Sequence, residues 1–302
     1  MVRDSKLIFQ NKRIIIFGCG YIGSAFAVHA LKAGANITAL THNKIQAQKL
    51  KELGIETILA ELGDDSWYDK ITGPFDFALN CVGSSSHDVE GYRRSYLEGM
   101  RSILTWSKRC TIGTFVYTSS TSVYSQNDGG LVDESACTDG ISDQAKILID
   151  TENLLSSVFY TGSNIKRNFI LRLAGIYGPQ RHYLLDQIRS GVITNASNNF
   201  LNLVHQEDIV AAIEACFNAS EEIESGIYNC SDNNPSTKSE VIEWLSELLK
   251  IRLPVLTTNM ASHKRLGSLN RRISSQKLIN RLDWRPIYPS YQHGYKAIIE
   301  TV

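Results

Sequence analysis

The chain has 302 residues, and 43% of them are hydrophobic, which is enough for a full core without a metal or disulfide to hold it together. Its 31 lysines and arginines equal its 31 aspartates and glutamates, so the formal net charge is zero. Duplex nucleic-acid binders carry a strong positive charge, so we expect no nucleic-acid partner. No apolar run reaches the ~18 residues of a membrane span, and the N-terminal residues lack the apolar core of a signal peptide. We therefore expect no membrane partner.

The six cysteines are scattered along the chain and form no CxxC pair. Most of them lie in apolar patterns, where a free thiol behaves as a small hydrophobic side chain. This usage indicates a reducing compartment, and we expect a cytoplasmic protein. The seven histidines show no ligand spacing such as HxxxH, so we expect no metal site.

Strand-like and helix-like patterns alternate through the first 173 residues. We expect strands at 13–17, 37–40, 55–59, 75–82, 114–118 and 169–173. Helices are expected at 24–32, 45–53, 89–109 and 143–159. Strands that alternate with helices of this length predict an α/β fold with a parallel, doubly wound sheet.

A glycine-rich turn follows the first expected strand. Gly18, Gly20 and Gly23 fit the pattern GxGxxG between a hydrophobic strand and a helix. Gly18 permits a tight turn, Gly20 lets the backbone approach a pyrophosphate, and Gly23 lets the helix pack close to the strand. Tyr21 and Ile22 lie between these glycines and are also expected to contact the cofactor, and the free N–H groups at the start of the following helix suit phosphates. The pattern predicts a dinucleotide-binding Rossmann domain over residues 1–173.

The end of the second strand bears on the choice of cofactor. An NAD site usually carries a carboxylate there, about 20 residues after the glycines, to hold the ribose hydroxyls. This chain has Thr41, His42, Asn43 and Lys44 instead. A hydroxyl, an amide and a lysine suit a 2′-phosphate, so we favour NADP over NAD. The alternative is that Lys44 is only a solvated residue at the start of a helix.

After residue 173 the pattern loosens, with turn signals at 178–179 and 233–235. Helices are expected at 206–218, 239–250, 275–281 and 291–299, and a strand at 227–230. We expect residues 174–302 to be mixed: 201–230 return to the Rossmann core, and the remainder forms a smaller, partly helical substrate lobe. Such a lobe would cover the carboxyl edge of the sheet, where open α/β folds bind ligands.

Four segments resemble the extended short-chain dehydrogenase/reductase family, the NAD-dependent epimerase/dehydratase group. They are FVYTSSTSVY at 115–124, LRLAGIYGP at 171–179, NLVHQED at 202–208 and IYNC at 227–230. The resemblance covers nearly the whole chain and is nearest to an atypical subgroup, the YeeZ-like proteins. Most of the family has GxxGxxG, whereas Phe17 here takes the place of the first glycine. The resemblance implies a Rossmann fold and NAD(P)-dependent chemistry.

The family uses a tetrad of Asn, Ser or Thr, Tyr and Lys. The resemblance places Ser120 on the serine position and Lys146 on the lysine position, where lysine also binds the nicotinamide ribose. The tyrosine position, four residues before the lysine, holds Ser142, and the asparagine position holds Tyr96. An alkoxide at Ser142 lies beyond ordinary pKa shifts, so the tetrad is incomplete. Tyr124 or Tyr96 could supply the proton, or each could be a packed aromatic side chain.

The resemblance also implies further cofactor and substrate residues. Glu61 and Leu62 match the pair near the adenine ring. Val82 and Gly83 match the stretch that lines the cofactor, and Leu173 falls near the nicotinamide carboxamide.

Candidate substrate residues are Ser84, Thr121, Arg181 and Arg272. The arginines would favour an anionic or sugar-like substrate through bidentate hydrogen bonds, unless they are ordinary surface arginines.

Two functions are consistent with these features. The first is an NADP-dependent epimerase/dehydratase-like or reductase-like enzyme that acts on a small polar substrate, with a sugar-like compound as one option. The second is a non-catalytic NADP-binding sensor or scaffold, because the tetrad is incomplete. Family members often dimerise through helices equivalent to 89–109 and 143–159, so a homodimer is a further expectation.

Overall fold

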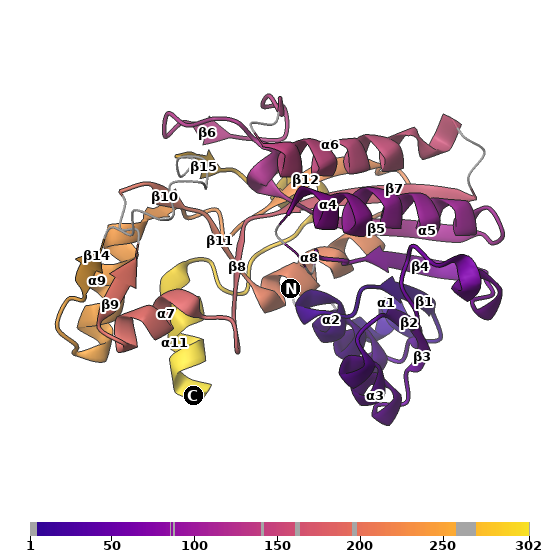
Figure 1. Ribbon diagram of the computed structural model, residues 1–302, viewed down its shortest axis with the longest axis horizontal. Coiled ribbons are helices and arrows are strands. Elements are labelled where there is room, and N and C mark those ends of the chain that lie inside the picture. Colours follow the sequence, from indigo (N-terminus) through magenta and orange to yellow (C-terminus); the bar gives the residue numbers. More distant parts are fainter. Residues whose placement is uncertain are drawn as a thin grey trace.

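The computed structural model describes residues 5–84, 86, 88–139, 142–160, 164–194, 198–257 and 270–301. A large sheet domain carries a smaller lobe beside it, and α7, α9 and α11 lie in that lobe (Figure 1). Helix α7 spans Tyr183–Arg189, α9 spans Lys238–Leu249 and α11 spans Tyr291–Thr301. In the described part of the chain, no helix is both long and apolar enough to cross a membrane.

The large sheet has seven parallel strands in the order β12-β7-β5-β4-β1-β2-β3. Their bounds are β1 Arg13–Phe17, β2 Asn36–Thr41, β3 Glu56–Leu59, β4 Phe75–Asn80, β5 Ile112–Ser120, β7 Ile165–Leu173 and β12 Gly226–Cys230. The strand order reverses beside β1, which makes the sheet doubly wound. The predicted fold class is therefore confirmed.

Helices cover both faces of this sheet, and β1 shows why. Ile14 and Ile16 are buried in one core cluster, whereas Ile15 and Phe17 are buried in another. Side chains alternate between the faces of a strand, so a fully apolar strand needs cover on both sides. On the first face pack α2 (Tyr21–Lys32), α8 (Gln206–Phe217) and α10 (Gln276–Leu282). On the second face pack α5 (Gly99–Ser107) and α6 (Asp143–Ser156).

Some elements differ from the predictions. The helix expected at 89–109 consists of three consecutive pieces: α4 (Val89–Tyr92), a π-helical segment η2 (Arg93–Glu98) and α5. Helices α1 (Ser5–Phe9) and α7 were not expected, because 5 and 7 residues are too short to show a clear helical period. Helix α3 spans Lys44–Glu52, one residue earlier than expected.

The described residues after 173 form three small two-stranded sheets among themselves and a fourth with β6, which comes from earlier in the chain. Pairs are β8 (Gly175–Tyr177) with β11 (Leu203–His205), β9 (Val192–Thr194) with β14 (Val255–Thr257), β10 (Phe200–Leu201) with β13 (Ser236–Thr237), and β15 (Arg272–Ile273) with β6 (Leu131–Val132). Residues 203–205 therefore lie outside the large sheet, although α8 and β12 do return to it. Helix α10 also packs in the large core through Leu278 and Leu282, which the sequence did not predict.

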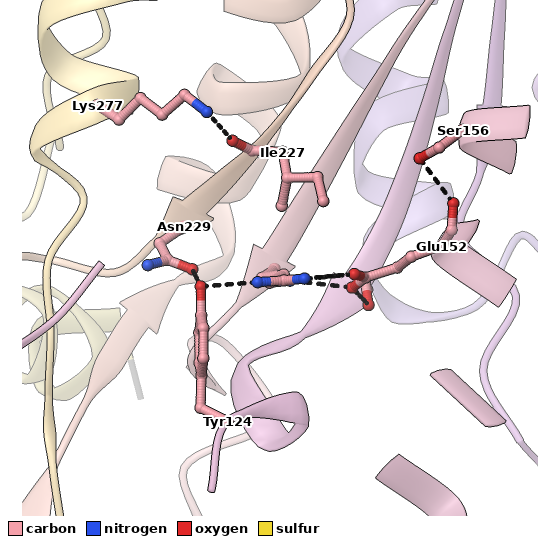
Figure 2. A network of polar contacts seen from close by, with 8 residues as sticks. Tyr124, Glu152, Ser156, Ile227, Asn229 and Lys277 are labelled. Atoms are coloured by element: carbon pink, nitrogen blue, oxygen red, sulfur yellow. Dashed lines mark hydrogen bonds and ion pairs between the residues drawn. The ribbon is translucent and has the colours of Figure 1, made fainter. Parts of the chain in front are cut away.

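A buried polar network ties α6 to three strands (Figure 2). The Arg172 guanidinium, on β7, forms an ion pair of 2.6 Å with Glu152 of α6. It also donates to the Tyr124 hydroxyl at 2.9 Å, and that hydroxyl donates to Asn229 of β12 at 2.8 Å. Ser119, near the end of β5, donates to Glu152 at 2.6 Å. Because a buried charge without a partner is very costly, this network holds α6 and the end of β5 in one arrangement.

Two aspartates are buried where the lobe meets the large domain. Asp208, on α8, accepts hydrogen bonds from the backbone N–H groups of Ile287 (2.5 Å) and Tyr288 (3.3 Å). Asp232, after β12, accepts one from the Asn234 backbone N–H at 3.0 Å. Each carboxylate keeps a second oxygen that is buried and has no hydrogen-bond partner among the described residues. Burial raises the pKa of both carboxyl groups to about 7.

We predict that Asp232→Asn reduces the pH dependence of stability. An aspartate in the unfolded chain loses its proton near pH 4, whereas Asp232 in the folded chain keeps its proton up to about 7. The unfolded state then binds fewer protons, so this group makes the free energy of unfolding fall as pH rises from about 4 to 7. Asparagine does not titrate, so the variant avoids this fall in the free energy of unfolding. At pH 8 it should be more stable than the wild type by about 1–3 kcal/mol.

Urea unfolding at pH 5 and pH 8 measures this difference, with the exposed Asp65→Asn as the control. If the free energy of unfolding changes between pH 5 and pH 8 by the same amount in the wild type and in Asp232→Asn, then Asp232 does not titrate in this way.

Candidate functional site

A cleft of about 740 Å³ lies along the carboxyl ends of the parallel strands. This edge is where open α/β sheets bind their ligands. Most of the predicted cofactor residues line the cleft: Gly18, Gly20, Tyr21, Ile22, Thr41, Asn43, Glu61, Leu62, Val82, Gly83 and Leu173. Three other candidates, Ser84, Ser120 and Arg181, line it as well.

The glycine-rich loop between β1 and α2 has no room for a side chain at Gly18 or Gly23. Gly18 has φ of +83°, and a Cβ there would lie 2.7 Å from the Val82 backbone at the end of β4. A Cβ at Gly23 would lie 2.2 Å from the Gly18 carbonyl oxygen, so α2 packs directly on the loop. Gly23 does not line the cleft; it acts through this packing. The two glycines thus hold the loop close to β4 and α2, as the sequence predicted.

Gly20 differs, because a Cβ there would meet no atom within 4 Å. It is the N-cap residue of the 12-residue helix α2, and no side chain caps that end of the helix. The N-terminus of α2 therefore presents backbone N–H groups and the positive end of the helix dipole to the cleft. An open glycine beside an uncapped helix start fits the pyrophosphate of a dinucleotide.

The end of β2 carries no carboxylate. Thr41 is buried, and its hydroxyl accepts a hydrogen bond from the Asn43 backbone N–H at 3.2 Å. The Asn43 carboxamide caps α3 by accepting from the Gln46 N–H at 3.0 Å. His42 lines the cleft, and Lys44 is the exposed first residue of α3, just outside the lining. Polar and cationic groups thus surround the place where NAD sites carry an acid.

Ser120 ends β5 at the floor of the cleft. Its hydroxyl oxygen accepts a hydrogen bond from the Ser122 backbone N–H at 3.1 Å. That bond orients the side chain and leaves the hydroxyl hydrogen available to a substrate oxygen. Ser120 therefore has a free hydroxyl hydrogen in the cleft, and its catalytic role stays a prediction.

The predicted lysine does not lie beside Ser120. Lys146 is on the outer side of α6, where its side chain is 60% exposed and its Nζ lies 3.3 Å from Asp143. Ser142 caps α6 by accepting from the Ala145 N–H at 3.1 Å. Leu148 is the α6 residue that lines the cleft. Residues two positions apart on an α-helix differ in direction by ~200° around the helix axis. Lys146 and Leu148 therefore face nearly opposite sides of α6.

Three other predicted residues also lie outside the cleft lining. Tyr124 is fully buried in the network around Arg172, where its hydroxyl is already engaged. Thr121 is buried, and its carbonyl accepts a hydrogen bond from Arg271 at 2.9 Å. Arg272 donates to the Gly129 carbonyl at 2.9 Å and lies over the Phe200 ring. The structure thus commits each of these groups to packing or to loop contacts.

The α4–η2 segment contributes four side chains to the cleft lining: Tyr92, Arg94, Ser95 and Tyr96. The sequence singled out Tyr96 through the tetrad, but it gave no signal for the other three. The Tyr92 and Tyr96 rings lie 5.1 Å apart. Burial raises the pKa of Tyr96, while a hydrogen bond from the Ser84 backbone opposes this rise. The π-helical turn, which changes the helical spacing here, has no recognisable sequence signal.

Among the described residues, no group of three His, Cys, Asp or Glu side chains is placed to hold a metal ion. The six cysteines form no disulfide. The polar side chains that line the cleft include several hydroxyls, three tyrosines (Tyr21, Tyr92 and Tyr96) and two arginines (Arg94 and Arg181).

We predict that Gly20→Ala weakens dinucleotide binding without weakening the fold. The added methyl group meets no protein atom within 4 Å but enters the space beside the start of α2. The melting temperature should stay within about 2 °C of the wild type, while the Kd for NADPH rises at least about tenfold. Differential scanning fluorimetry and isothermal titration calorimetry measure the two quantities.

Gly23→Ala is the matched variant, because its methyl group meets the Gly18 carbonyl and should lower the melting temperature. If Gly20→Ala binds NADPH as tightly as the wild type, the pyrophosphate does not lie against Gly20.

Comparison with known proteins finds solved structures of similar fold. The putative NAD-dependent epimerase/dehydratase from Methylobacillus flagellatus is 24% identical, with 96% of this chain and 98% of that chain covered and a TM-score of 0.76. The UDP-glucuronic acid 4-epimerase from Bacillus cereus, in complex with UDP-glucuronic acid and NAD, is 16% identical, with 96% and 100% covered and a TM-score of 0.81. MoeE5 in complex with UDP-glucose and NAD is 17% identical, with 95% and 97% covered and a TM-score of 0.82.

At these identities the likeness shows a shared fold. No curated protein matches the chain. The profile of the NAD dependent epimerase/dehydratase family matches residues 14–231, which is most of the chain. The narrower resemblance to the YeeZ-like subgroup stays a prediction. Because this match covers well over half of the sequence, the chain belongs to the NAD-dependent epimerase/dehydratase family.

Proposed function

We propose that the protein binds NADP in the cleft and acts as an oxidoreductase or epimerase on a small polar substrate, with a sugar-like compound as one option. One observation carries this proposal. The phosphate loop, the carboxylate-free end of β2 and the Ser120 hydroxyl all line the same cleft. The structures that hold NAD with a UDP-sugar share this fold, which supports a polar substrate.

NADP is favoured over NAD by the charges near the end of β2. Of the residues that line the cleft, Glu61 is the only one with a carboxylate, and it follows β3 rather than β2. His42 and Asn43 line the cleft, and Lys44 is exposed beside them. A 2′-phosphate needs hydrogen-bond donors and positive charge, which these residues supply. The family description names NAD, so this preference is a proposal for this chain.

The proposed chemistry divides between the cofactor and the chain. When bound, the nicotinamide supplies or accepts the hydride. The backbone N–H groups at the start of α2 hold the phosphates. Ser120 donates a hydrogen bond to the substrate oxygen and stabilises charge that develops there. Tyr96, a phenol that lines the cleft, is the best-placed side chain to exchange a proton, since Tyr124 is closed off by Arg172 and Asn229.

A non-catalytic NADP-binding sensor or scaffold is the second candidate, and the orientation of α6 favours it. The side of this helix that lines the cleft carries Leu148, which neither donates nor accepts a proton. Lys146 could contact a nicotinamide ribose only if its side chain left Asp143 and α6 rotated. The cofactor site is then complete, while the proton-transfer groups of α6 are missing from the cleft.

The homodimer and the cytoplasmic location stay predictions of the sequence. The exposed positions of α6, one of the two helices expected in a dimer contact, are polar: Asp143, Lys146, Asp150, Asn153 and Ser156. A contact through this face would be rich in charges and water rather than apolar.

Turnover is tested with NADPH and a panel of polar carbonyl compounds that includes keto sugars. We predict substrate-dependent loss of the reduced-nicotinamide absorbance. Ser120→Ala should lower kcat by about 100-fold, because one hydrogen-bond donor to the reacting oxygen is lost, while the Kd for NADPH stays unchanged. Ser220→Ala, at an exposed serine outside the cleft lining, is the control. Tight NADPH binding with no turnover of any compound would favour the sensor.

The cofactor preference is tested separately with Lys44→Ala. Loss of this cation should raise the Kd for NADPH about 3- to 10-fold and leave the Kd for NADH unchanged, because NADH lacks the 2′-phosphate. Lys49→Ala, an exposed lysine on the same helix and outside the cleft lining, should change neither value. A wild-type protein that binds NADH more tightly than NADPH would contradict the proposed preference.

A further inference from the structure

The turn at residues 178–181, at the start of the smaller lobe, rests on the phosphate loop. The Tyr21 hydroxyl, from the GxGxxG loop, donates to the Pro179 carbonyl at 2.9 Å. The Arg181 guanidinium lies over the same ring, 5.5 Å from its centroid. The backbone of Tyr21 is also held, because the Gln206 side chain donates to the Tyr21 carbonyl at 2.9 Å. Tyr21 thus joins the phosphate loop to residues more than 150 positions away in the sequence.

The turn itself is tightly held. Gly178 and Arg181 exchange two backbone hydrogen bonds, of 3.1 Å and 3.0 Å. Gly178 has φ of +151°, and a Cβ there would lie 2.7 Å from the Tyr21 hydroxyl oxygen. Gln180 has φ of +61°, in the left-handed region. The backbone of Arg181 is therefore fixed in place against the phosphate loop, and only its side chain is free to adjust.

Apart from its contact with the Tyr21 ring, the Arg181 guanidinium is available to a ligand. Its side chain is exposed and lines the cleft together with Gly20 and Tyr21. Within the described residues, its guanidinium forms no ion pair and no hydrogen bond. Glu61, the carboxylate in the cleft lining, follows β3, which is two strands away from β1. Two strand spacings are about 10 Å, so Glu61 is not positioned to neutralise Arg181.

The phosphate loop needs such a cation. Residues 18–23 contain no lysine or arginine, so the loop offers only backbone N–H groups and the dipole of α2. A pyrophosphate carries two negative charges, and a guanidinium binds phosphate oxygens with paired, charge-assisted hydrogen bonds. Arg94, the other arginine that lines the cleft, comes from η2. Among the described residues it is Arg181, and not Arg94, whose guanidinium lies over the Tyr21 ring of the phosphate loop.

We propose that Arg181 binds the pyrophosphate of the dinucleotide, opposite the backbone N–H groups of the phosphate loop, and is not a substrate residue. This assignment rests on the proposed cofactor site and changes the role that the sequence suggested for Arg181. The pyrophosphate is then held between the large domain, through α2, and the smaller lobe, through the turn at 178–181. Cofactor binding would thereby join the two parts of the chain.

Isothermal titration calorimetry with three ligands tests the assignment: NADPH, 2′-phospho-ADP-ribose and 2′-AMP, which lacks the pyrophosphate. For Arg181→Gln, the Kd for the first two ligands should rise about tenfold, and the Kd for 2′-AMP should stay unchanged. The wild-type affinity for NADPH should also fall more steeply with added salt than that of the variant. Arg189→Gln, at an exposed arginine on α7 outside the cleft lining, is the matched control.

Tyr21→Leu is a second variant, which keeps Arg181 but removes the ring beneath its guanidinium. Its Kd for NADPH should rise about threefold, less than for Arg181→Gln. If Arg181→Gln binds NADPH as tightly as the wild type, or loses affinity for 2′-AMP to the same degree, the assignment of Arg181 is wrong while the cofactor site stands. If the wild type binds none of the three ligands, the proposed function itself fails.

Discussion

The buried ion pair between Arg172 and Glu152 decides how α6 faces the cleft. Glu152 points from α6 into the domain, where Arg172 and Ser119 satisfy its carboxylate. Leu148 lies one helical turn earlier on the same side of α6, so the ion pair directs Leu148 to the cleft. Lys146, two positions before Leu148, then points to the opposite, outer side of the helix. Because breaking a buried pair leaves an uncompensated charge, α6 cannot rotate to exchange these residues at low cost.

The same network also shapes the floor and the side of the cleft. Ser119, which contacts Glu152, is the neighbour of Ser120 in β5, so the position of Ser120 depends on this ion pair. On the other side, Arg172 reaches Asn229 of β12 through the Tyr124 hydroxyl (Figure 2). One guanidinium therefore links α6 and the ends of β5 and β12. The cofactor half of the cleft does not depend on it, since the phosphate loop is held by Gly18 and Gly23.

The sequence predicts well what depends on neighbouring residues. The glycine loop and the strands of the large sheet were found because their patterns are local and strongly apolar, as in β1. The outward orientation of the Lys146 side chain was missed because it depends on the ion pair between Glu152 and Arg172, which are 20 positions apart. Tyr124 was a candidate proton donor because it ends the segment 115–124, and Arg272 was a candidate substrate residue because it lies in the smaller lobe. Their side chains are instead engaged by distant residues, Asn229 and Gly129. Of the cleft residues in α4 and η2, Tyr92, Arg94 and Ser95 were missed because a π-helical turn leaves no regular spacing.

The central claim is that an NADP-type dinucleotide occupies the cleft with its pyrophosphate on the phosphate loop. A crystal structure of the protein with NADPH tests it most directly. The account predicts the pyrophosphate between the backbone N–H groups at the start of α2 and the Arg181 guanidinium, with the 2′-phosphate beside His42, Asn43 and Lys44. A dinucleotide bound outside this cleft, or bound in it with the 2′-phosphate directed away from the end of β2, would contradict the account.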